Sequence, residues 1–396
     1  EGACPRAHAH YRLAAPDRGA VRQEPGPGGA ERLDRSRSCL RERHVLVSDE
    51  DGRRRRGPAR VRGEARARVQ RGVAIEVATG VHRIDTPLGS RVLSLYLFVG
   101  RERSLLLDVG VDETAKKGLM PYLAGIGLEP ASIRWAVVSH ADVDHFGGIA
   151  SLRELSPDVV CLAHRLDAPL ITDYAAYETR RARGFREPWG LDESPEVLAW
   201  TRSVTREGPV NMTVTGGETV DLGGGWELEI VHVPGHTHGH LAVYDPRSRT
   251  LAVADAVLGD MVPHADGRPA FPPTYRYVDS YLATISRCEA LRPELLLTAH
   301  YPTMRGDAAP EFLARSRGFV EKVDTVIVDE LDAAGSPGLR LQQLLARANP
   351  RLGSWPSEGT EGALAFPVVG HLERLLALGR INAWQAADGY RVRNSR

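Results

Sequence analysis

Short apolar runs separated by turn residues open the first half of the chain and predict a sheet. Val73–Val77, Val92–Val99 and Leu105–Val109 are rich in β-branched and large apolar residues, and Pro87–Gly89 marks a turn between two of them. We expect these runs to form the antiparallel start of the sheet. Thr114–Ile126 has helical spacing instead.

Buried strands recur through the middle of the chain, with one long polar interruption. Residues 165–210 are rich in Arg and Glu, so we expect a partly helical insertion over one face of the fold. The predicted strands are Trp135–Ser139, Val159–Ala163, Thr219–Leu222, Trp226–Val233, Leu241–Tyr244, Thr250–Ala254 and Leu295–Thr298.

After the last of these strands the apolar spacing becomes mainly helical. Helices are predicted over Glu311–Ala334, Arg340–Ala348 and Pro367–Leu378, followed by a hairpin over Ile381–Val392. The stretch Gly370–Ile381 is similar to the third helix and turn of a winged-helix domain, in which the hairpin would be the wing.

The first 72 residues differ from the rest in composition. They contain 18 Arg, no Lys and 10 acidic residues, and they show no sustained apolar period. Such a segment cannot bury enough apolar surface to offset its ordering entropy, which predicts disorder. A basic arm that binds nucleic acid and translated sequence upstream of the native start are the alternatives. We therefore predict a disordered segment 1–72, a strand-rich domain 73–308 and a mainly helical domain 309–396.

Composition argues against membrane-spanning and disulfide-rich proteins. No run approaches the ~20 apolar residues that a membrane-spanning helix needs. Cys4, Cys39, Cys161 and Cys288 are widely spaced and form no CxxC pair, which argues against a disulfide framework and a thiolate zinc finger. The sequence also opens without an apolar signal region. We expect a protein of a reduced, cytoplasmic compartment.

Candidate chemistry is concentrated directly after predicted strands. The segment Ser139–Gly148 supplies His140, Asp142, Asp144 and His145 within six positions. Burying these groups together would be costly, because the carboxylates repel each other and lose their hydration. A bound cation is the simplest compensation.

Two further groups of polar residues follow strands in the same way. His232–His240 contains four histidines, Asp255 ends one strand, and His300 follows another. Taken alone, Asp255 would more often be a turn residue and His300 an ordinary polar histidine. Because each group follows a strand, we expect all of them to converge on one sheet edge.

In this order the motifs resemble those of the metallo-β-lactamase superfamily of hydrolases. That family carries an HxHxDH motif, a His in a GHT segment, a bridging Asp and a final His. The matching residues are His140, Asp144, His145, His236, Asp255 and His300. Leu105–Gly110 also resembles the family's early strand, with Asp108 at its end. The resemblance covers about residues 73–305 and implies an αββα sandwich with a metal site at one edge.

The resemblance also implies a dinuclear metal site. The resemblance assigns His140, position 142 and His236 to the first metal ion. It assigns Asp144, His145 and His300 to the second. Asp255 would bridge the two ions, and Asp144 would also handle a proton in catalysis. Ligation by nitrogen and oxygen alone implies zinc, with manganese or iron as alternatives.

Position 142 departs from the family, which usually has His there. Asp142 lowers the charge of the cluster by one, which would raise the pKa of water held there and favour harder metals than zinc. We expect Asp142 to bind metal. The alternative is a carboxylate too short to reach the ion, which would leave a weak first site.

Other polar residues near the motifs receive supporting roles. Thr237 and His240 fit the GHT segment of the family, and we expect His240 to orient a ligand. His238 stands where the family commonly has Pro, and we expect it to be exposed. His164 is predicted to line the pocket, with an ordinary strand-end histidine as the alternative.

The sequence thus predicts a metal-dependent hydrolase that activates water at two metal ions to attack an ester, thioester or lactone. A (ribo)nuclease that uses the winged-helix-like domain is one alternative, and a degenerate, non-catalytic binding protein is another. A small-molecule substrate is the expected partner, a homodimer is left open, and nucleic acid is less favoured. Four arginines of the insertion bind an acidic substrate group or form a solvated helix face: Arg180, Arg181, Arg183 and Arg186.

Overall fold

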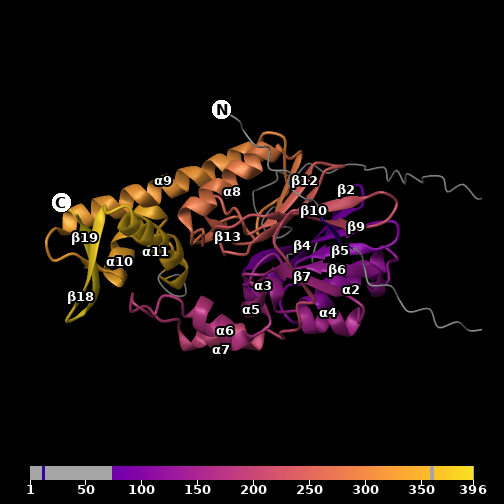
Figure 1. Cartoon of the computed structure of the whole chain (residues 1–396), viewed down its shortest axis with the longest axis horizontal. Helices are drawn as coiled ribbons and strands as arrows, with labels where there is room; N and C mark the ends of the chain where they lie inside the picture. The colour runs from indigo at the N-terminus through magenta and orange to yellow at the C-terminus, as the bar shows by residue number, and fades with distance from the viewer. Residues whose placement is uncertain (1–10, 14–73, 357–360, 396) are drawn as a thin grey trace, which may run out of the picture.

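A computed structural model describes residues 11–13, 74–356 and 361–395 as two packed sheets with helices on both outer faces (Figure 1). The first sheet has seven strands in the order β2-β3-β4-β5-β6-β7-β8. They are β2 (Ala74–Ala78), β3 (Val81–Leu88), β4 (Arg91–Val99), β5 (Ser104–Leu107), β6 (Ile133–Val137), β7 (Val160–His164) and β8 (Met212–Val214). Neighbours from β2 to β5 are antiparallel, and those from β5 to β8 are parallel.

The second sheet also has seven strands, in the order β1-β9-β10-β11-β12-β15-β16. They are β1 (Tyr11–Leu13), β9 (Glu218–Asp221), β10 (Glu227–His232), β11 (Leu241–Asp245), β12 (Thr250–Ala254), β15 (Leu295–Thr298) and β16 (Met304–Arg305). The strands β12 and β15 are neighbours in this sheet and run parallel. A separate hairpin joins β13 (Val262–Pro263) to β14 (Pro269–Phe271).

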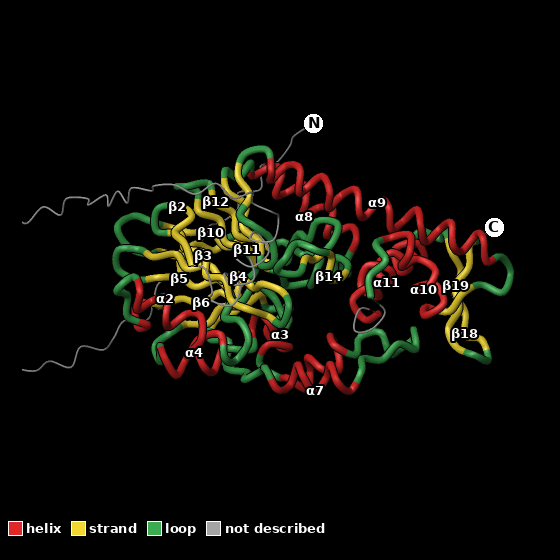
Figure 2. Tube along the Cα trace, turned by 180° about the vertical axis from the view of Figure 1, so that it is seen from behind, coloured by secondary structure: helices red, strands yellow, loops and turns green. Residues whose placement is uncertain are grey.

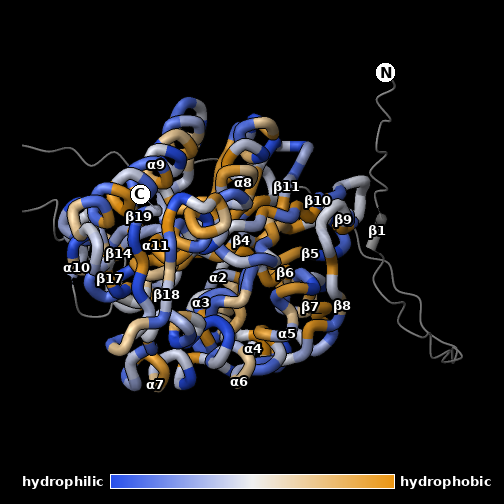
Figure 3. The backbone as a smooth tube through the Cα atoms, turned by 60° about the vertical axis from the view of Figure 1, so that its left-hand side comes forward, coloured by the Kyte–Doolittle hydropathy of each residue, from blue (hydrophilic) through white to orange (hydrophobic). Residues whose placement is uncertain are grey.

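The facing sides of the two sheets form a closed apolar core. Alternate residues of each strand point inward, so Tyr96 and Trp135 of the first sheet share one buried cluster with Leu228 and Val243 of the second. Figure 3 shows hydrophobic positions concentrated along these strands. This core fixes the register of the strands, and with it the positions of the residues that follow each strand.

Helices cover the outer face of the first sheet. A π-helical turn, η1 (Ala115–Leu119), continues into α2 (Met120–Gly125), and α3 (Val143–Phe146) is followed by α4 (Ile149–Leu155). Their apolar side chains, among them Leu119, Phe146 and Ile149, pack against Ile84 and Leu106 of the sheet.

The outer face of the second sheet is covered by α8 (Val278–Leu291) and α9 (Ala308–Ala334). The helix α9 continues past the sandwich to the C-terminal region (Figure 1). That region contains β17 (Leu339–Arg340), α10 (Leu341–Leu352), α11 (Glu361–Ala377), β18 (Ile381–Ala386) and β19 (Gly389–Asn394). One apolar cluster extends from Leu251 and Leu296 of the sheet to Leu372 and Val392, so both regions share a core.

The insertion bridges the sandwich and the C-terminal helices. It holds α5 (Ala168–Ile171), α6 (Tyr174–Tyr177), a π-helical turn η3 (Glu178–Ala182) and α7 (Pro195–Ser203), seen below the sandwich in Figure 1 and from behind in Figure 2. Tyr177 packs within the cluster of the first sheet. Farther along, the Phe185 ring lies 4.8 Å from Phe366 of α11, and the Trp189 ring lies 5.2 Å from Tyr390 of β19.

The predicted αββα architecture is confirmed, but several single elements were not predicted, among them the short strands β8, β13, β14 and β16. The sequence pattern did not predict β3 or α8. In β3 the charged residues Arg83 and Asp85 interrupt the apolar pattern by which a strand is recognised. The strand tolerates them because their side chains form an ion pair at 2.6 Å. Most of segment 1–72 lies outside the described residues, but Tyr11–Leu13 forms an edge strand on β9, so order does not first begin near Val73.

The C-terminal elements follow the expected order of three helices and a hairpin, with the short strand β17 in addition. Their winged-helix-like character and the domain boundary at residue 308 stay predictions. Among the helices of the described residues, none has both the length and the apolar character that crossing a bilayer requires.

Candidate metal centre

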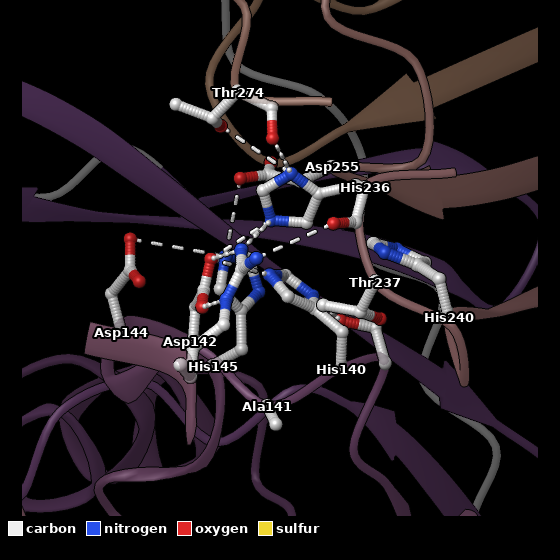
Figure 4. A network of polar contacts seen from close by, with 12 residues as sticks. His140, Ala141, Asp142, Asp144, His145, His236, Thr237, His240, Asp255 and Thr274 are labelled. Carbon is white, nitrogen blue, oxygen red and sulfur yellow. Dashed lines mark hydrogen bonds and ion pairs between the residues drawn. The ribbon is translucent and has the colours of Figure 1, made fainter. Parts of the chain in front are cut away.

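The predicted ligand residues meet at one edge of the two sheets, in segments that follow strands (Figure 4). The loop after β6 carries His140 and Asp142, and α3 carries Asp144 and His145. The other three donors come from the second sheet: His236 after β10, Asp255 after β12, and His300 after β15. The expected convergence on one edge is therefore present.

A first group of donors is formed by His140, Asp142 and His236, whose ligand atoms all lie within 4.8 Å of one another. The Oδ2 atom of Asp142 is 2.8 Å from Nε2 of His236 and 3.4 Å from Nε2 of His140. The carboxylate thus lies close enough to both imidazoles to share an ion with them.

A second group is formed by Asp144, His145 and His300, and Asp255 lies between the groups. The Oδ2 atom of Asp144 is 3.8 Å from Nε2 of His145 and 3.9 Å from Nε2 of His300. The Oδ2 atom of Asp255 is 3.5 Å and 3.3 Å from the same two nitrogens. Asp255 also forms a donor triplet with His145 and His140, which belong to different groups.

The hydrogen bonds of the histidines leave lone pairs directed at the centre. The Nδ1 atoms of His236 and His300 lie 3.0 Å and 2.8 Å from the backbone carbonyls of Thr274 and Val92. A ring nitrogen next to a carbonyl carries the proton, so Nε2 of a neutral ring is an acceptor. His145 Nδ1 is bonded to a carboxylate of Asp108 at 2.8 Å in the same way.

Buried atoms without partners test whether a cation fits here. The Nε2 atoms of His140 and His145 and the Oδ1 atom of Asp255 are buried, and among the described residues they have no hydrogen-bond partner. Leaving such atoms unsatisfied costs roughly 1–3 kcal/mol each. The donor set therefore fits divalent metal ions bound through nitrogen and oxygen.

Electrostatics favour positive charge at the same place. Burial would lower the pKa of His145, but Asp108, Asp144 and Asp255 outweigh it and raise that pKa well above its ordinary value. Burial would raise the pKa of Asp255, yet His300 and His145 hold it well below its usual range. A site that binds a proton this strongly also attracts a metal cation in its place.

Asp108 holds the second group from behind. Its Oδ1 atom accepts a hydrogen bond from the backbone N–H of Ser139 at 2.7 Å, and its Oδ2 atom accepts one from Ser139 Oγ at 3.0 Å. Ser139 Oγ in turn lies 2.9 Å from Nδ1 of His140. Asp108 has a left-handed φ of 65°, a strained conformation for a residue with a side chain. This residue therefore sets the orientation of both His145 and His140.

Close backbone packing explains the glycines after the motif. A Cβ atom on Gly148 would lie 2.6 Å from the carbonyl oxygen of Val109, next to Asp108. Its φ of −95° needs no glycine, so the close approach of two backbones is the reason for the residue.

His240 and Thr237 both contact residues of the centre or of its loops, and their supporting role stays a prediction. The ring of His240 stacks on His140, with centroids 4.4 Å apart, and its Nε2 donates to the Val253 carbonyl at 3.1 Å. Burial holds the pKa of His240 well below its ordinary value, so the ring is neutral. Thr237 Oγ1 donates to Asp167 at 2.6 Å.

Asp167 was missed by sequence reasoning. This buried carboxylate also accepts hydrogen bonds from the backbone N–H groups of Gly239 and Ala141, at 2.8 Å and 3.2 Å, and so links the two ligand loops. Its position shortly after a strand was the available signal. His164 stacks on His232 at 4.3 Å and belongs to none of the donor groups found among the described residues. Its place in the pocket stays a prediction. His238 is exposed, as expected, and stacks on Tyr277 at 3.6 Å.

Arg181 corrects the expectation that the insertion arginines form a solvated face. Its Nε and Nη2 atoms donate to the two carboxylate oxygens of Asp142, at 2.7 Å and 2.8 Å. The side chain of Arg181 is only 10% exposed. The other arginines lie outward: Arg180 and Arg186 are exposed, and Arg183 pairs with Asp192 at 2.5 Å.

Arg91 lies near Asp144 and Asp255 and was also missed. Its guanidinium lies over the Phe271 ring at 4.6 Å. Burial lowers the pKa of Arg91, and the charges of Asp144 and Asp255 oppose that shift. Among the described residues it has no ion-pair partner, in contrast to Arg181. The first position of β4 carries this cation, which no motif would have identified.

The family model described as "Metallo-beta-lactamase superfamily" matches residues 91–300. The chain is 26% identical over 255 residues to the probable metallo-hydrolase YflN of Bacillus subtilis, across 60% of this chain and 90% of the relative. It is 29% identical over 172 residues to the probable metallo-hydrolase Rv2300c of Mycobacterium tuberculosis, which covers 43% of this chain and 50% of that protein. The acyl-coenzyme A thioesterase MBLAC2 of Gallus gallus is 25% identical over 178 residues, with 43% and 59% covered.

Two solved structures share the fold. The metallo-beta-lactamase family protein TTHA1429 of Thermus thermophilus has a TM-score of 0.61 and 19% identity, covering 81% of this chain and 100% of its own. A beta-lactamase domain protein from Burkholderia ambifaria has a TM-score of 0.60 and 17% identity, covering 81% and 93%.

Proposed function

Because this chain belongs to the metallo-β-lactamase superfamily, whose model matches residues 91–300, we propose that it hydrolyses an acyl thioester with divalent metal ions. Oxygen esters and lactones share the same carbonyl chemistry and are the next substrates to test. That the chain is a hydrolytic enzyme is supported by the metallo-hydrolase relatives. The thioester follows from the name of the MBLAC2 relatives, which are 24–25% identical to this chain.

One observation carries the metal-dependent chemistry. The buried nitrogens of His140 and His145 and an oxygen of Asp255 face the same small volume without hydrogen-bond partners among the described residues. A degenerate binding protein would not need to retain this unsatisfied donor set. When bound, divalent metal polarises the scissile carbonyl and makes water a better nucleophile at neutral pH.

The two donor groups suit two ions, one at His140, Asp142 and His236 and the other at Asp144, His145 and His300, with Asp255 between them. Zinc suits this nitrogen and oxygen donor set best, and manganese or iron would also bind it.

The residues of the chain itself supply positioning and proton transfer. Asp144 is 15% exposed through its side chain, more than Asp255 at 9%, so it is open to the space a substrate would enter. Its carboxylate is suited to accept a proton from the attacking water and pass it to the leaving thiolate. Arg91, a cation without an ion-pair partner among the described residues, would bind an anionic group of the substrate.

The nuclease alternative has less support. Its nucleic-acid contact would come from the third C-terminal helix, α11. In that helix Val368, Val369, His371 and Leu372 are fully buried. Phe366 of the same helix packs on Phe185 of the insertion. Much of α11 is therefore committed to the core and cannot lie in a groove of nucleic acid.

The two free cysteines of the described residues, Cys161 and Cys288, are buried, and burial raises the pKa of their thiols to about 11 and about 12. Inert thiols of this kind agree with the proposal of a cytoplasmic protein but do not require it.

A substrate panel tests the proposal. The full chain is stripped with a chelator, reloaded with zinc, manganese or iron, and assayed on acyl-coenzyme A, an aryl ester, a lactone and RNA. We expect metal-dependent release of free thiol from the acyl-coenzyme A, lost in the stripped protein and restored by metal. Cleavage of RNA without thioester hydrolysis would select the nuclease instead.

A further inference from the structure

Arg181 and Asp142 form a bidentate ion pair at the position where the sequence departs from the family motif. The two nitrogen–oxygen distances are 2.7 Å and 2.8 Å, and the pair lies against the first donor group. Bidentate pairing fixes both the direction and the rotation of a carboxylate, which a single hydrogen bond would not.

The rotation that results directs one oxygen at the imidazoles. Oδ1 of Asp142 accepts only from Nε of Arg181 in this pair, whereas Oδ2 accepts from Nη2. Oδ2 also lies 2.8 Å from Nε2 of His236 and 3.4 Å from Nε2 of His140. Nε2 of His236 is an acceptor, because Nδ1 faces the Thr274 carbonyl at 3.0 Å. Two acceptors this close need a positive group beside both. In this structure Nη2 of Arg181 lies 2.8 Å from Oδ2 and 3.2 Å from Nε2 of His236, and a metal ion would bind the same two atoms.

Charge gives a second reason for the arginine. A carboxylate in place of a neutral imidazole lowers the charge of the centre by one. The guanidinium returns the missing positive charge, so the pair together carries the net charge of a neutral histidine.

The fold anchors Arg181 independently of Asp142. Its guanidinium lies over the Phe366 ring of α11 at 4.4 Å, and Nη1 reaches the backbone carbonyl of His236 at 3.5 Å. The loop after β10 and the C-terminal helix α11 therefore hold it from two sides, which distinguishes it from a mobile surface arginine.

We propose that Arg181 and Asp142 act as one unit that replaces the histidine of the family motif, with Arg181 as the positioning residue that aims Asp142 at the first metal ion. This inference rests on the metal centre of the proposed function, although it does not depend on the substrate. It also changes the expectation for Asp142→His. That substitution alone would leave a buried guanidinium unpaired beside an imidazole and a cation, so it should not restore a normal family site.

Cobalt binding tests the positioning role without any assay of hydrolysis. Metal-free full chain is titrated with Co²⁺, followed by calorimetry and by the visible absorption of bound cobalt. Loss of an outer residue that orients a ligand weakens metal binding by roughly 10- to 100-fold. We expect Arg181→Met to weaken one of two cobalt equivalents by about this factor and to change the visible spectrum, while the other equivalent is retained. Arg180→Met, a change of the exposed neighbouring arginine, is the control and should match the unmodified chain.

A pair of variants separates positioning from simple structural support. Asp142→His alone should bind the first cobalt ion weakly. Asp142→His combined with Arg181→Met should bind that ion with an affinity within about tenfold of the unmodified chain, because the charge of the centre is balanced again. Melting temperatures of all variants are measured in the metal-free state. If Arg181→Met fails to fold, the comparison of Asp142→His with the unmodified chain still tests the unit.

Three results would overturn the proposal. The first is cobalt binding in Arg181→Met that equals that of the unmodified chain. The second is an additional cobalt equivalent in Arg181→Met, which would mean that the arginine competes with the ion. The third is an Asp142→His variant that binds cobalt as tightly as the double variant. None of them bears on hydrolysis. If the chain shows the expected cobalt binding but hydrolyses no substrate on the panel, the proposed role of Arg181 and Asp142 stands and the proposed function is wrong.

Discussion

The carboxylate of Asp108 contacts Nδ1 of His145 at 2.8 Å, which links the end of β5 directly to the metal centre. The same carboxylate holds Ser139, which orients His140. One residue outside the donor groups therefore controls the direction of imidazoles in both of them. This makes Asp108 the most informative position outside the ligands themselves.

Asp108→Asn should weaken metal binding by roughly 10- to 100-fold, because an amide cannot hold the proton on His145 Nδ1 as a carboxylate does. Binding is measured by competition with a chelating dye. Asp112→Asn is the control, since Asp112 faces Ser151 and Arg206 rather than the centre. Equal affinity in the two variants would show that Asp108 does not orient the ligand.

His145→Ala and His300→Ala should each remove most of one metal equivalent and most of the activity. Both residues belong to the same donor group, so the double variant should be little worse than either single one. Metal content of the purified proteins is measured by mass spectrometry. Additive losses of metal and activity would mean that the two histidines serve different ions.

Asp142→Ala should lower occupancy of the first donor group and leave the second group filled. It also leaves Arg181 buried without its counter-ion, a change that typically costs about 3 kcal/mol. Metal content and urea denaturation of the metal-free chain measure the two effects. The combined change Asp142→Ala with Arg181→Met should recover part of the stability but none of the occupancy. A full complement of metal in Asp142→Ala would exclude it as a ligand.

Arg91→Gln should raise KM for an acyl-coenzyme A by about tenfold or more and leave kcat within a few-fold, because a charge-assisted contact to an anionic substrate is worth ~1.5–3 kcal/mol. An uncharged aryl ester should show little change, which serves as an internal control. Arg268→Gln, an exposed arginine between β13 and β14, is the matched variant. Equal effects on charged and uncharged substrates would rule out anion binding by Arg91.

Stability should fall as the pH drops from about 7 to about 5, in part because of His164. Burial and the neighbouring His232 lower the pKa of His164 from 6.5 to about 4. Below 6.5 the unfolded chain takes up a proton that the folded chain does not, so the free energy of unfolding falls until the pH nears 4. Thermal melts of His164→Gln should show a shallower pH dependence than the unmodified chain. If the melting temperature of His164→Gln depends on pH as steeply as that of the unmodified chain, another group causes the loss of stability. His264→Gln is the control.

The architecture and the ligands were predictable because strands and metal motifs are local in sequence. His140, Asp144 and His145 stand within six positions, and each remaining ligand directly follows an apolar run. Strand β3 was missed because Arg83 and Asp85 interrupt its apolar pattern. The two side chains form an ion pair with each other in the folded strand, which the sequence pattern does not show.

The partners of the ligands were not predictable in the same way. Arg181 lies 39 positions from Asp142, and its partner could be recognised only after the insertion had folded over the centre. Asp167 contacts Gly239 over 72 positions. Spacing along the chain contains no information about such contacts, since they depend on how the insertion packs against both sheets.

The edge-to-face contact of Phe185 with Phe366 and the placement of Arg181 over the same Phe366 ring determine how short a functional chain can be. A chain shortened to residues 73–308 would keep every predicted ligand, yet it would lose the aromatic wall behind Arg181 and expose the apolar side of the insertion. The C-terminal helices are therefore part of the reaction centre's scaffold. Any exchange of this region between related proteins would have to carry its matching insertion with it.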